Sequence, residues 1–318
     1  MSSYRPLVLS LTLNDKTIKS GVLFALAAYA MWGFAPLYFK LLQALPAQEI
    51  LMHRVIWSVL VLCILVIFTG KFTQVKIAAK NIKVMSILLL SGLLLAVNWL
   101  IFIWAINNGH LLDGSLGYYI NPLLNVFLGR LFLQERLRPL QKAAVALAFI
   151  GVSILVISFG QVPWIALSLA ATFGIYGLLR KKVAVDSLPG LLLETMMMLP
   201  FALIYWYGFS SELSDLTSNS LSLNVSLICA GIVTTAPLLC FTGAARRLRY
   251  STLGFFQYLG PSIMFVIAVW WFNEALDMAK ITTFAFVWLA LAMFSFDSYR
   301  AYRSSKKQAA INATIPVR

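Results

Sequence analysis

Ten stretches of about 20 mostly apolar residues follow one another along this chain. A helix of that length rises 1.5 Å per residue and therefore spans the roughly 30 Å hydrocarbon core of a bilayer. The stretches cover 20–42, 48–69, 84–106, 111–133, 139–159, 162–180, 188–209, 222–245, 250–272 and 281–302. The segments that join them are short, so the sequence predicts an all-α integral membrane protein with ten transmembrane helices.

The composition agrees with a membrane protein and excludes several other classes. Hydrophobic residues make up 61% of the chain and charged residues 11%, against roughly a quarter charged in soluble domains. So little charge cannot cover the surface of a soluble enzyme, and so much apolar side chain does not suit a disordered or disulfide-rich secreted chain. The three cysteines lie inside predicted helices and no Cys/His spacing matches a ligand set, so no metal site is expected.

The positive charge is distributed in a way that predicts sidedness. A net charge of +14 would suggest nucleic acid in a soluble protein. Here, all 25 Lys and Arg except Lys40, Arg54 and Lys280 lie in the tails or around the loops that follow each even-numbered stretch. The positive-inside rule places those segments in the cytoplasm. We therefore expect cytoplasmic tails at 1–19 and 303–318, and no nucleic-acid partner.

The two halves of the chain resemble each other. Pro122 is followed thirteen residues later by Glu135, and Pro261 is followed thirteen residues later by Glu274. Similar matches pair Trp32 with Phe173, and they divide the chain into five-helix repeats at 20–160 and 161–302. Because five is odd, the second repeat enters the membrane from the opposite face. Two inverted repeats are typical of secondary transporters with alternating access.

Five segments carry a resemblance to a known family. They read AYAMWGFAP (28–36), HRVIWS (53–58), NWLIFIWA (98–105), SLGYYINPL (115–123) and STLGFFQY (251–258). Over residues 18–302 the chain resembles EamA-type members of the drug/metabolite transporter superfamily, and within them the RarD group, which is associated with chloramphenicol sensitivity. The resemblance implies a ten-helix inverted-repeat permease of the bacterial cytoplasmic membrane. It leaves the substrate and the oligomeric state open, a homodimer included.

Charged residues inside predicted membrane helices are candidate functional groups because burying them in hydrocarbon is costly. Arg54 can hold a substrate carboxylate through a bidentate contact. Alternatively, its side chain snorkels toward the outer headgroups or pairs with Glu49, His53 or Asp113. We expect Arg54→Ala to reduce transport while leaving membrane insertion intact.

Three further residues are candidates for proton coupling or gating. Glu49 and His53 lie one turn apart in the second predicted helix, and either carry a proton or form a structural pair. Glu194 lies inside the seventh predicted helix, where burial of a carboxylate suits proton coupling. The alternative for Glu194 is an ion pair with Arg180, Lys181 or Lys182.

Polar and aromatic residues near the middle of several predicted helices suggest a central cavity. Pro122 and Pro261 are expected to bend their helices and to free backbone carbonyls beside this cavity. The candidate substrate-binding residues around them are Trp32, Asn98, Trp99, Tyr118, Asn121, Tyr176, Thr235, Gln257 and Tyr258. Such a set fits an amphipathic organic solute. Each member alone is also explained by interhelical packing.

The sequence therefore predicts a secondary active transporter that moves a small organic metabolite or drug by alternating access, coupled to protons. No GxxxxGK[ST] pattern indicates ATP hydrolysis, and no cofactor is expected. A membrane-embedded enzyme is an alternative, but no HExxH or GxSxG motif supports it. A channel or a sensor is a further alternative. The expected partners are a small-molecule substrate, the lipid bilayer and protons.

Overall fold

The computed structural model describes residues 15–42, 44–107, 111–160, 162–270 and 278–314. Every regular element in these ranges is a helix. The elements are α1 (Asp15–Leu41), α2 (Ala47–Phe68), α3 (Phe72–Lys80), α4 (Ile82–Asn107), α5 (Leu111–Leu133), α6 (Pro139–Phe159), α7 (Trp164–Lys182), α8 (Ser187–Phe209), the 3₁₀ turn η1 (Glu212–Ser214), α9 (Leu221–Arg247), α10 (Tyr250–Gln257), α11 (Leu259–Trp270) and α12 (Met278–Thr314).

The long helices coincide with the predicted apolar stretches. Seven of them, α1, α2, α4, α6, α8, α9 and α12, are long and apolar enough to cross a membrane, in a search of the described residues. Helices α5 and α7 and the pair α10–α11 lie at the three remaining predicted stretches. The all-helical, multi-pass membrane architecture is thus confirmed. Its organisation as ten spans in two repeats stays a prediction.

Several helices extend beyond the predicted apolar stretches, and one short helix lies outside them. The loop after α2 contains a short helix, α3, whose lysines and apolar residues alternate in a helical pattern that a search for long apolar stretches does not detect. The predicted tails also contain helix: α1 already begins at Asp15, and α12 continues past residue 302 to Thr314. No proline or glycine interrupts residues 303–314, so the last helix propagates beyond its apolar part.

The two predicted helix-breaking prolines behave differently. Helix α5 runs through Pro122 from Leu111 to Leu133, so Pro122 does not end it. In contrast, the ninth predicted helix is interrupted at Tyr258, between α10 and α11, three residues before Pro261. A proline is tolerated in the first turn of a helix, where its missing N–H has no partner anyway, and Pro261 occupies such a position in α11.

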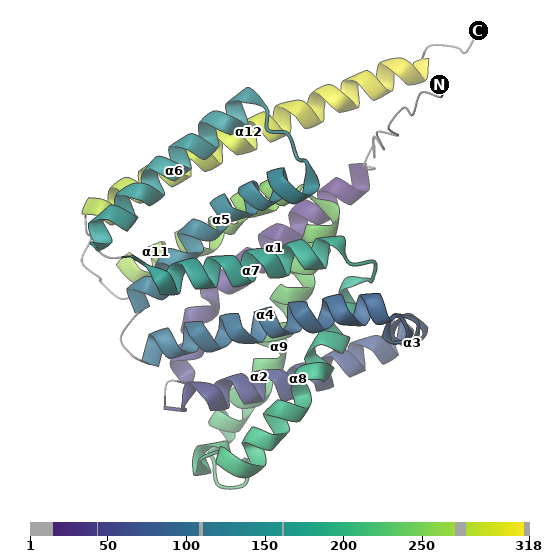
Figure 1. Ribbon diagram of the computed structural model, residues 1–318, viewed down its shortest axis with the longest axis vertical. Coiled ribbons are helices and arrows are strands. Elements are labelled where there is room, and N and C mark those ends of the chain that lie inside the picture. The colour runs from purple at the N-terminus through teal and green to yellow at the C-terminus, as the bar shows by residue number, and fades with distance from the viewer. Residues whose placement is uncertain (1–14, 43, 108–110, 161, 271–277, 315–318) are drawn as a thin grey trace.

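The long helices of the two predicted halves pack against one another. Helix α1 packs along α9, and α7 packs along α4; α2 packs on α9, and α8 on α4. These contacts between the two halves form two matching pairs, if α1 corresponds to α7, α2 to α8 and α4 to α9. The pairs α2–α8, α5–α10 and α6–α12 join corresponding helices directly. In Figure 1 the start of α1 and the end of α12 lie at the same end of the bundle, together with α3.

Two glycines allow helices to approach each other closely. A Cβ at Gly231 in α9 would lie 2.5 Å from the carbonyl of Trp57 in α2, and a Cβ at Gly254 in α10 would lie 2.8 Å from the carbonyl oxygen of Pro122 in α5. Because only glycine fits at these crossings, the backbones of the two predicted halves meet without intervening side chains. The largest apolar core forms where α1, α2, α4, α7, α8 and α9 converge.

Candidate substrate site

Arg54 lies among four helices in the interior of the bundle. Its Nε donates a hydrogen bond to Thr234 Oγ1 of α9 at 2.9 Å. Its guanidinium carbon lies 4.3 Å from the ring centre of Trp99 in α4 and 5.3 Å from that of Phe39 in α1. Cation–π contacts of this kind stabilise a desolvated cation. The side chain is thus buried and fixed by its neighbours; it does not snorkel to the outer face.

No carboxylate in the described part of the chain lies within ion-pair distance of Arg54. The hydroxyls of Tyr118 and Tyr38 are its principal electrostatic neighbours. Glu49 binds elsewhere, and the side chain of Asp113 lies outside the described residues. A buried cation is costly unless it is paired, and none of the described carboxylates pairs with Arg54.

Glu49 and His53 do not contact each other directly. The Glu49 carboxylate accepts hydrogen bonds from the Ser211 N–H at 2.8 Å, from Ser211 Oγ at 2.9 Å and from Ser214 Oγ at 2.5 Å. Ser214 Oγ in turn lies 3.3 Å from His53 Nε2. The predicted pair is therefore bridged by a serine, and Glu49 ties the start of α2 to the connection between α8 and α9.

The hydrogen-bond directions in this network define the state of His53. Indole N–H groups only donate, so Trp57 Nε1 donates to His53 Nδ1 at 3.2 Å. The Nδ1 atom is then unprotonated, and the proton on Nε2 is donated to Ser214, which donates to Glu49. A continuous chain of donors thus runs from Trp57 through His53 and Ser214 to Glu49.

Glu194 forms the ion pair that the sequence offered as the alternative to coupling. Its Oε1 lies 3.6 Å from Nη1 of Arg180 in α7, and both side chains are buried. Ser91 Oγ of α4 donates to the same carboxylate oxygen, and Arg180 Nη2 donates to the Ser187 carbonyl at 3.1 Å. Arg180 Nε and Nη1 and Glu194 Oε2 have no hydrogen-bond partner in the described structure. The pair is therefore incompletely satisfied.

The amide side chains predicted to line the cavity form hydrogen bonds between helices. Asn98 Nδ2 donates to the Leu169 carbonyl and Asn121 Nδ2 to the Ala170 carbonyl, which joins α4 and α5 to α7. Asn125 Nδ2 donates to Gln257 Oε1 at 3.1 Å. These contacts favour the packing interpretation in the conformation observed, and substrate binding by these amides stays a prediction.

Aromatic residues from the two predicted halves contact one another in two core clusters. The rings of Trp32 and Phe173, which correspond in the repeat, are 5.6 Å apart, and Tyr176 stacks on Phe241 at 6.0 Å. The Tyr258 hydroxyl donates to the carbonyl of its counterpart Tyr119 at 3.3 Å. The hydroxyls of Tyr29, Tyr176 and Thr235 are buried without partners in the described structure. The centre of the bundle therefore combines aromatic surface with unused polar groups.

The end of the bundle that holds the start of α1 is joined by polar contacts between the two predicted halves. Glu135 accepts hydrogen bonds from the N–H groups of Tyr250 and Ser251 and so caps the start of α10. Lys71 of the first half pairs with Asp186 of the second at 3.4 Å, and within the second half Asp186 also binds Arg246 at 2.5 Å. The hydrogen bond from Arg246 holds the pKa of Asp186 below its ordinary value.

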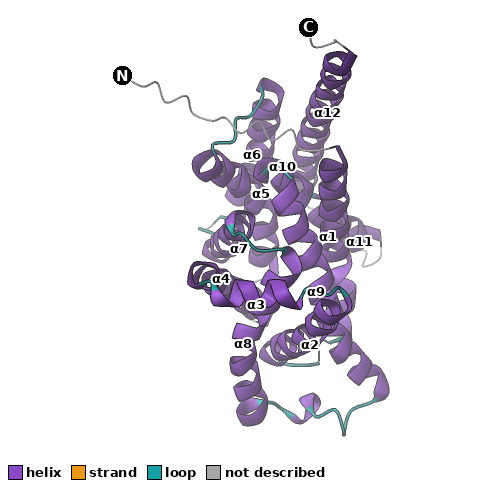
Figure 2. Ribbon diagram, turned by 90° about the vertical axis from the view of Figure 1, so that its right-hand side faces the viewer, coloured by secondary structure: helices purple, strands orange, loops and turns teal. Residues whose placement is uncertain are grey.

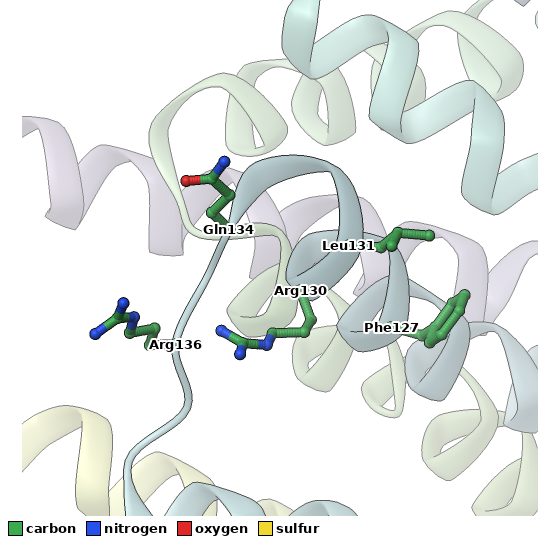
Figure 3. Close-up of a pocket in the computed structure, with 5 residues that line it drawn as sticks. All are labelled: Phe127, Arg130, Leu131, Gln134 and Arg136. Carbon is green, nitrogen blue, oxygen red and sulfur yellow. The ribbon is translucent and has the colours of Figure 1, made fainter. Parts of the chain in front are cut away.

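A small surface pocket at the end of α5 lies apart from Arg54. It is lined by Phe127, Arg130, Leu131, Gln134 and Arg136, and Figure 3 shows its two guanidinium groups beside the chain that leaves the helix. Gln134 there has a φ of +53°, as the chain turns out of α5. None of the substrate-binding residues predicted from the sequence lines this pocket.

The sequence did not identify the hydrogen-bond partners that fix the charged residues. Ser211 and Ser214 are more than 160 positions from Glu49, and Ser91 is 103 positions from Glu194. Serine and threonine in apolar helices are common, so no local signal distinguishes them. Thr234, the partner of Arg54, directly precedes the predicted residue Thr235.

Comparisons with known proteins identify the class. The profile of the EamA-like transporter family matches residues 19–157. A solved structure described as "Crystal structure of protein" has a TM-score of 0.69 at 18% identity, covering 88% of this chain and 98% of that chain, and shows the same fold. An all-helical, multi-pass bundle with this family match is a membrane transporter.

The more similar proteins define the group. An "Uncharacterized transporter" of Vibrio cholerae is 53% identical over 93% of this chain and 99% of that protein. "Protein RarD" of Escherichia coli strain K12 is 50% identical over 93% of this chain and 100% of its own length. A "Chloramphenicol-sensitive protein RarD" of Pseudomonas aeruginosa is 32% identical over 91% of this chain and 97% of its own length. The chain belongs to the RarD family of EamA-like transporters, and the resemblance read from its sequence is confirmed.

Proposed function

We propose that this protein is a proton-coupled secondary transporter for a small amphipathic organic anion, with Arg54 as the residue that receives the anionic group. The observation that carries the proposal is the Arg54 guanidinium, held by Thr234 and stacked on Trp99 without a described carboxylate partner. A carboxylate of the solute completes this site by charge-assisted hydrogen bonds. The aromatic rings around it suit the apolar part of the same solute.

The arrangement of helices supports alternating access. Corresponding helices of two inverted five-helix repeats, 20–160 and 161–302, have corresponding partners, and the family profile matches the residues of the first repeat alone. Such repeats exchange conformations when one half rocks against the other. The distribution of Lys and Arg supports cytoplasmic termini in a bacterial inner membrane.

Two buried polar groups at different depths are suited to gating. The Glu49–Ser214–His53 network ties α2 to the loop between α8 and α9 at one end of the bundle, and the Arg180–Glu194 pair lies nearer the other end. Protonation of a carboxylate weakens either contact, since the neutral acid accepts fewer hydrogen bonds and loses its ion pair. Proton movement and opening are thereby linked.

The test is transport in proteoliposomes with an imposed pH gradient. The screen includes amino acids and aromatic carboxylic acids. It also includes chloramphenicol, because the Pseudomonas aeruginosa relative is named a chloramphenicol-sensitive protein. We expect at least one solute to move several-fold faster with the gradient than after a protonophore collapses it. If no solute moves under either condition, the transport proposal fails, and equal rates under both conditions exclude proton coupling.

The matched variants are Arg54→Ala and Lys280→Ala, because both residues were expected near the outer face but only Arg54 lies in the site. Arg54→Ala is expected to abolish transport with normal membrane insertion, and Lys280→Ala to retain it. Wild-type kinetics in Arg54→Ala would contradict the assigned role.

A further inference from the structure

A groove of about 620 Å³ opens between α1, α10 and α12 at the end of the bundle where α1 begins. Helix α12 packs along α6 and α1 packs along α9, so the groove separates these two pairs of helices. In Figure 1 the α6–α12 pair forms an outer layer, and α12 projects beyond the bundle on the side where α1 starts. Figure 2 shows α12 above α1, with α10 at a height between them.

The floor of the groove is apolar and accessible from the lipid. Leu23 and Leu26 of α1 contribute exposed side chains, 67% and 40% accessible. Phe256 of α10 and Leu291 of α12 line the opposite wall. An aliphatic chain lying here is in contact with hydrocarbon-like side chains on both sides.

The rim of the groove is basic. Arg138, Arg247 and Arg249 line it together with Lys19. Asp297 neutralises Arg138 at 2.5 Å. Arg247 donates to the Gly243 carbonyl at 2.8 Å, and Arg249 donates to the Arg136 carbonyl at 2.8 Å. Carbonyls do not neutralise charge, and neither Arg247 nor Arg249 has a carboxylate partner among the described side chains.

One polar atom in the wall of the groove is also unused. The hydroxyl of Tyr302 in α12 is inaccessible to water and has no hydrogen-bond partner in the described structure. Burying a hydroxyl without a partner is unfavourable. The groove thus offers two guanidinium groups at one end and apolar side chains further along.

We propose that this groove binds an anionic phospholipid, with its phosphate at Arg247 and Arg249 and one acyl chain along Leu23, Leu26 and Phe256. The basic residues lie at the end of the helices and the apolar floor lies toward their middle. A lipid has the same arrangement, with its charged headgroup at the membrane surface and its acyl chains toward the middle. Basic pockets between membrane helices on the cytoplasmic side recognise anionic headgroups in this manner. A soluble anion would make no contact with the apolar floor. A zwitterionic lipid carries no net charge and would gain less from the two guanidinium groups.

The experiment is native mass spectrometry of the delipidated full chain titrated with phosphatidylglycerol or with phosphatidylcholine of the same acyl chains. We expect phosphatidylglycerol to bind wild-type protein at least about tenfold more tightly, because each nearby cation contributes about a factor of five. Inorganic phosphate is expected not to compete. Equal binding of the two lipids, or displacement by phosphate, would overturn the proposal.

Charge-removing variants distinguish lipid binding in this groove from binding that results from the net positive charge of the protein. In Arg247→Ala/Arg249→Ala the lipid preference is expected to disappear, and in Arg247→Lys/Arg249→Lys to persist in reduced form. The control Lys76→Ala/Lys80→Ala removes two exposed charges from α3, outside the groove, and is expected to keep the preference. A preference that survives the double alanine change, or that the control also loses, contradicts the site.

Ser295→Trp provides a test that keeps every charge. Ser295 is exposed and lines the groove, so an indole there occupies the path of the acyl chain. We expect this variant to lose bound phosphatidylglycerol while its circular dichroism stays native. Undiminished lipid binding by folded Ser295→Trp would place the lipid elsewhere.

Discussion

The buried guanidinium groups of Arg54 and Arg180 are stabilised by different kinds of neighbour. Arg180 has a carboxylate 3.6 Å away, so its charge is compensated within the protein. Arg54 has a hydroxyl, two aromatic faces and no described carboxylate. Buried ion pairs contribute little net stability, but removing one partner leaves an uncompensated charge. At the residue scale, the Arg180 charge is compensated by Glu194, whereas no described carboxylate compensates the charge of Arg54.

The buried pair makes a prediction for stability. Glu194→Gln is expected to lower the free energy of unfolding by about 3 kcal/mol or more, because the Arg180 charge remains without its partner. The double change Arg180→Met/Glu194→Leu is expected to recover most of that loss. Chemical unfolding in micelles, followed by circular dichroism, measures both.

The control for this cycle is Glu212→Gln, which removes an exposed acid from η1 and is expected to change stability by less than about 0.5 kcal/mol. If Arg180→Met/Glu194→Leu loses as much stability as Arg180→Met and Glu194→Leu measured singly and added together, the two side chains are not coupled.

At the scale of elements, the crossing of α2 and α9 fixes the geometry of the candidate site. Gly231 brings the backbone of α9 against Trp57, and Ser58 Oγ donates to the Gly231 carbonyl at 3.3 Å. Thr234, which holds Arg54, follows less than one turn later on α9. The distance between these two helices therefore determines whether Arg54 keeps its partner.

Gly231→Ala tests this crossing. The added Cβ would lie 2.5 Å from the Trp57 carbonyl, so we expect the helices to separate at a cost of about 1–3 kcal/mol. Gly208→Ala is the matched control, because it has the same gain in helix propensity and no atom within 4 Å of the new Cβ. Equal thermal stability of the two variants would show that the crossing tolerates a methyl group.

At the scale of the whole molecule, the sequence predicted the membrane architecture because each helix must satisfy its backbone internally and must be apolar over its length. Because this rule applies to each helix separately, it can be applied to the sequence alone. The sequence did not predict α3, and it predicted the distortion of the ninth helix at Pro261, whereas the interruption lies at Tyr258. Both features depend on short segments whose packing decides their structure. The sequence identified Arg54 and Glu194, because charge in an apolar helix is conspicuous.

The partners of these charged residues were not predictable in the same way. Trp99, Thr234, Ser91 and Ser214 come from other helices or loops, and only the fold brings them together. For Asn98, Asn121 and Gln257 the sequence identified the residues but not their contacts. Their polarity marked them as candidate ligand groups, whereas in the structure they join helices.

The measurement that tests the central claim most directly compares a panel of aromatic carboxylic acids with their methyl esters, by calorimetric titration of wild-type protein, Arg54→Lys and Arg54→Gln. A charge-assisted hydrogen bond of about 1.5–3 kcal/mol predicts that wild-type protein prefers the acid by about 10- to 100-fold. Arg54→Lys is expected to keep part of this preference and Arg54→Gln to bind acid and ester alike. The same acid-over-ester ratio in wild type and Arg54→Gln would contradict the assignment of Arg54 as the anion-binding residue.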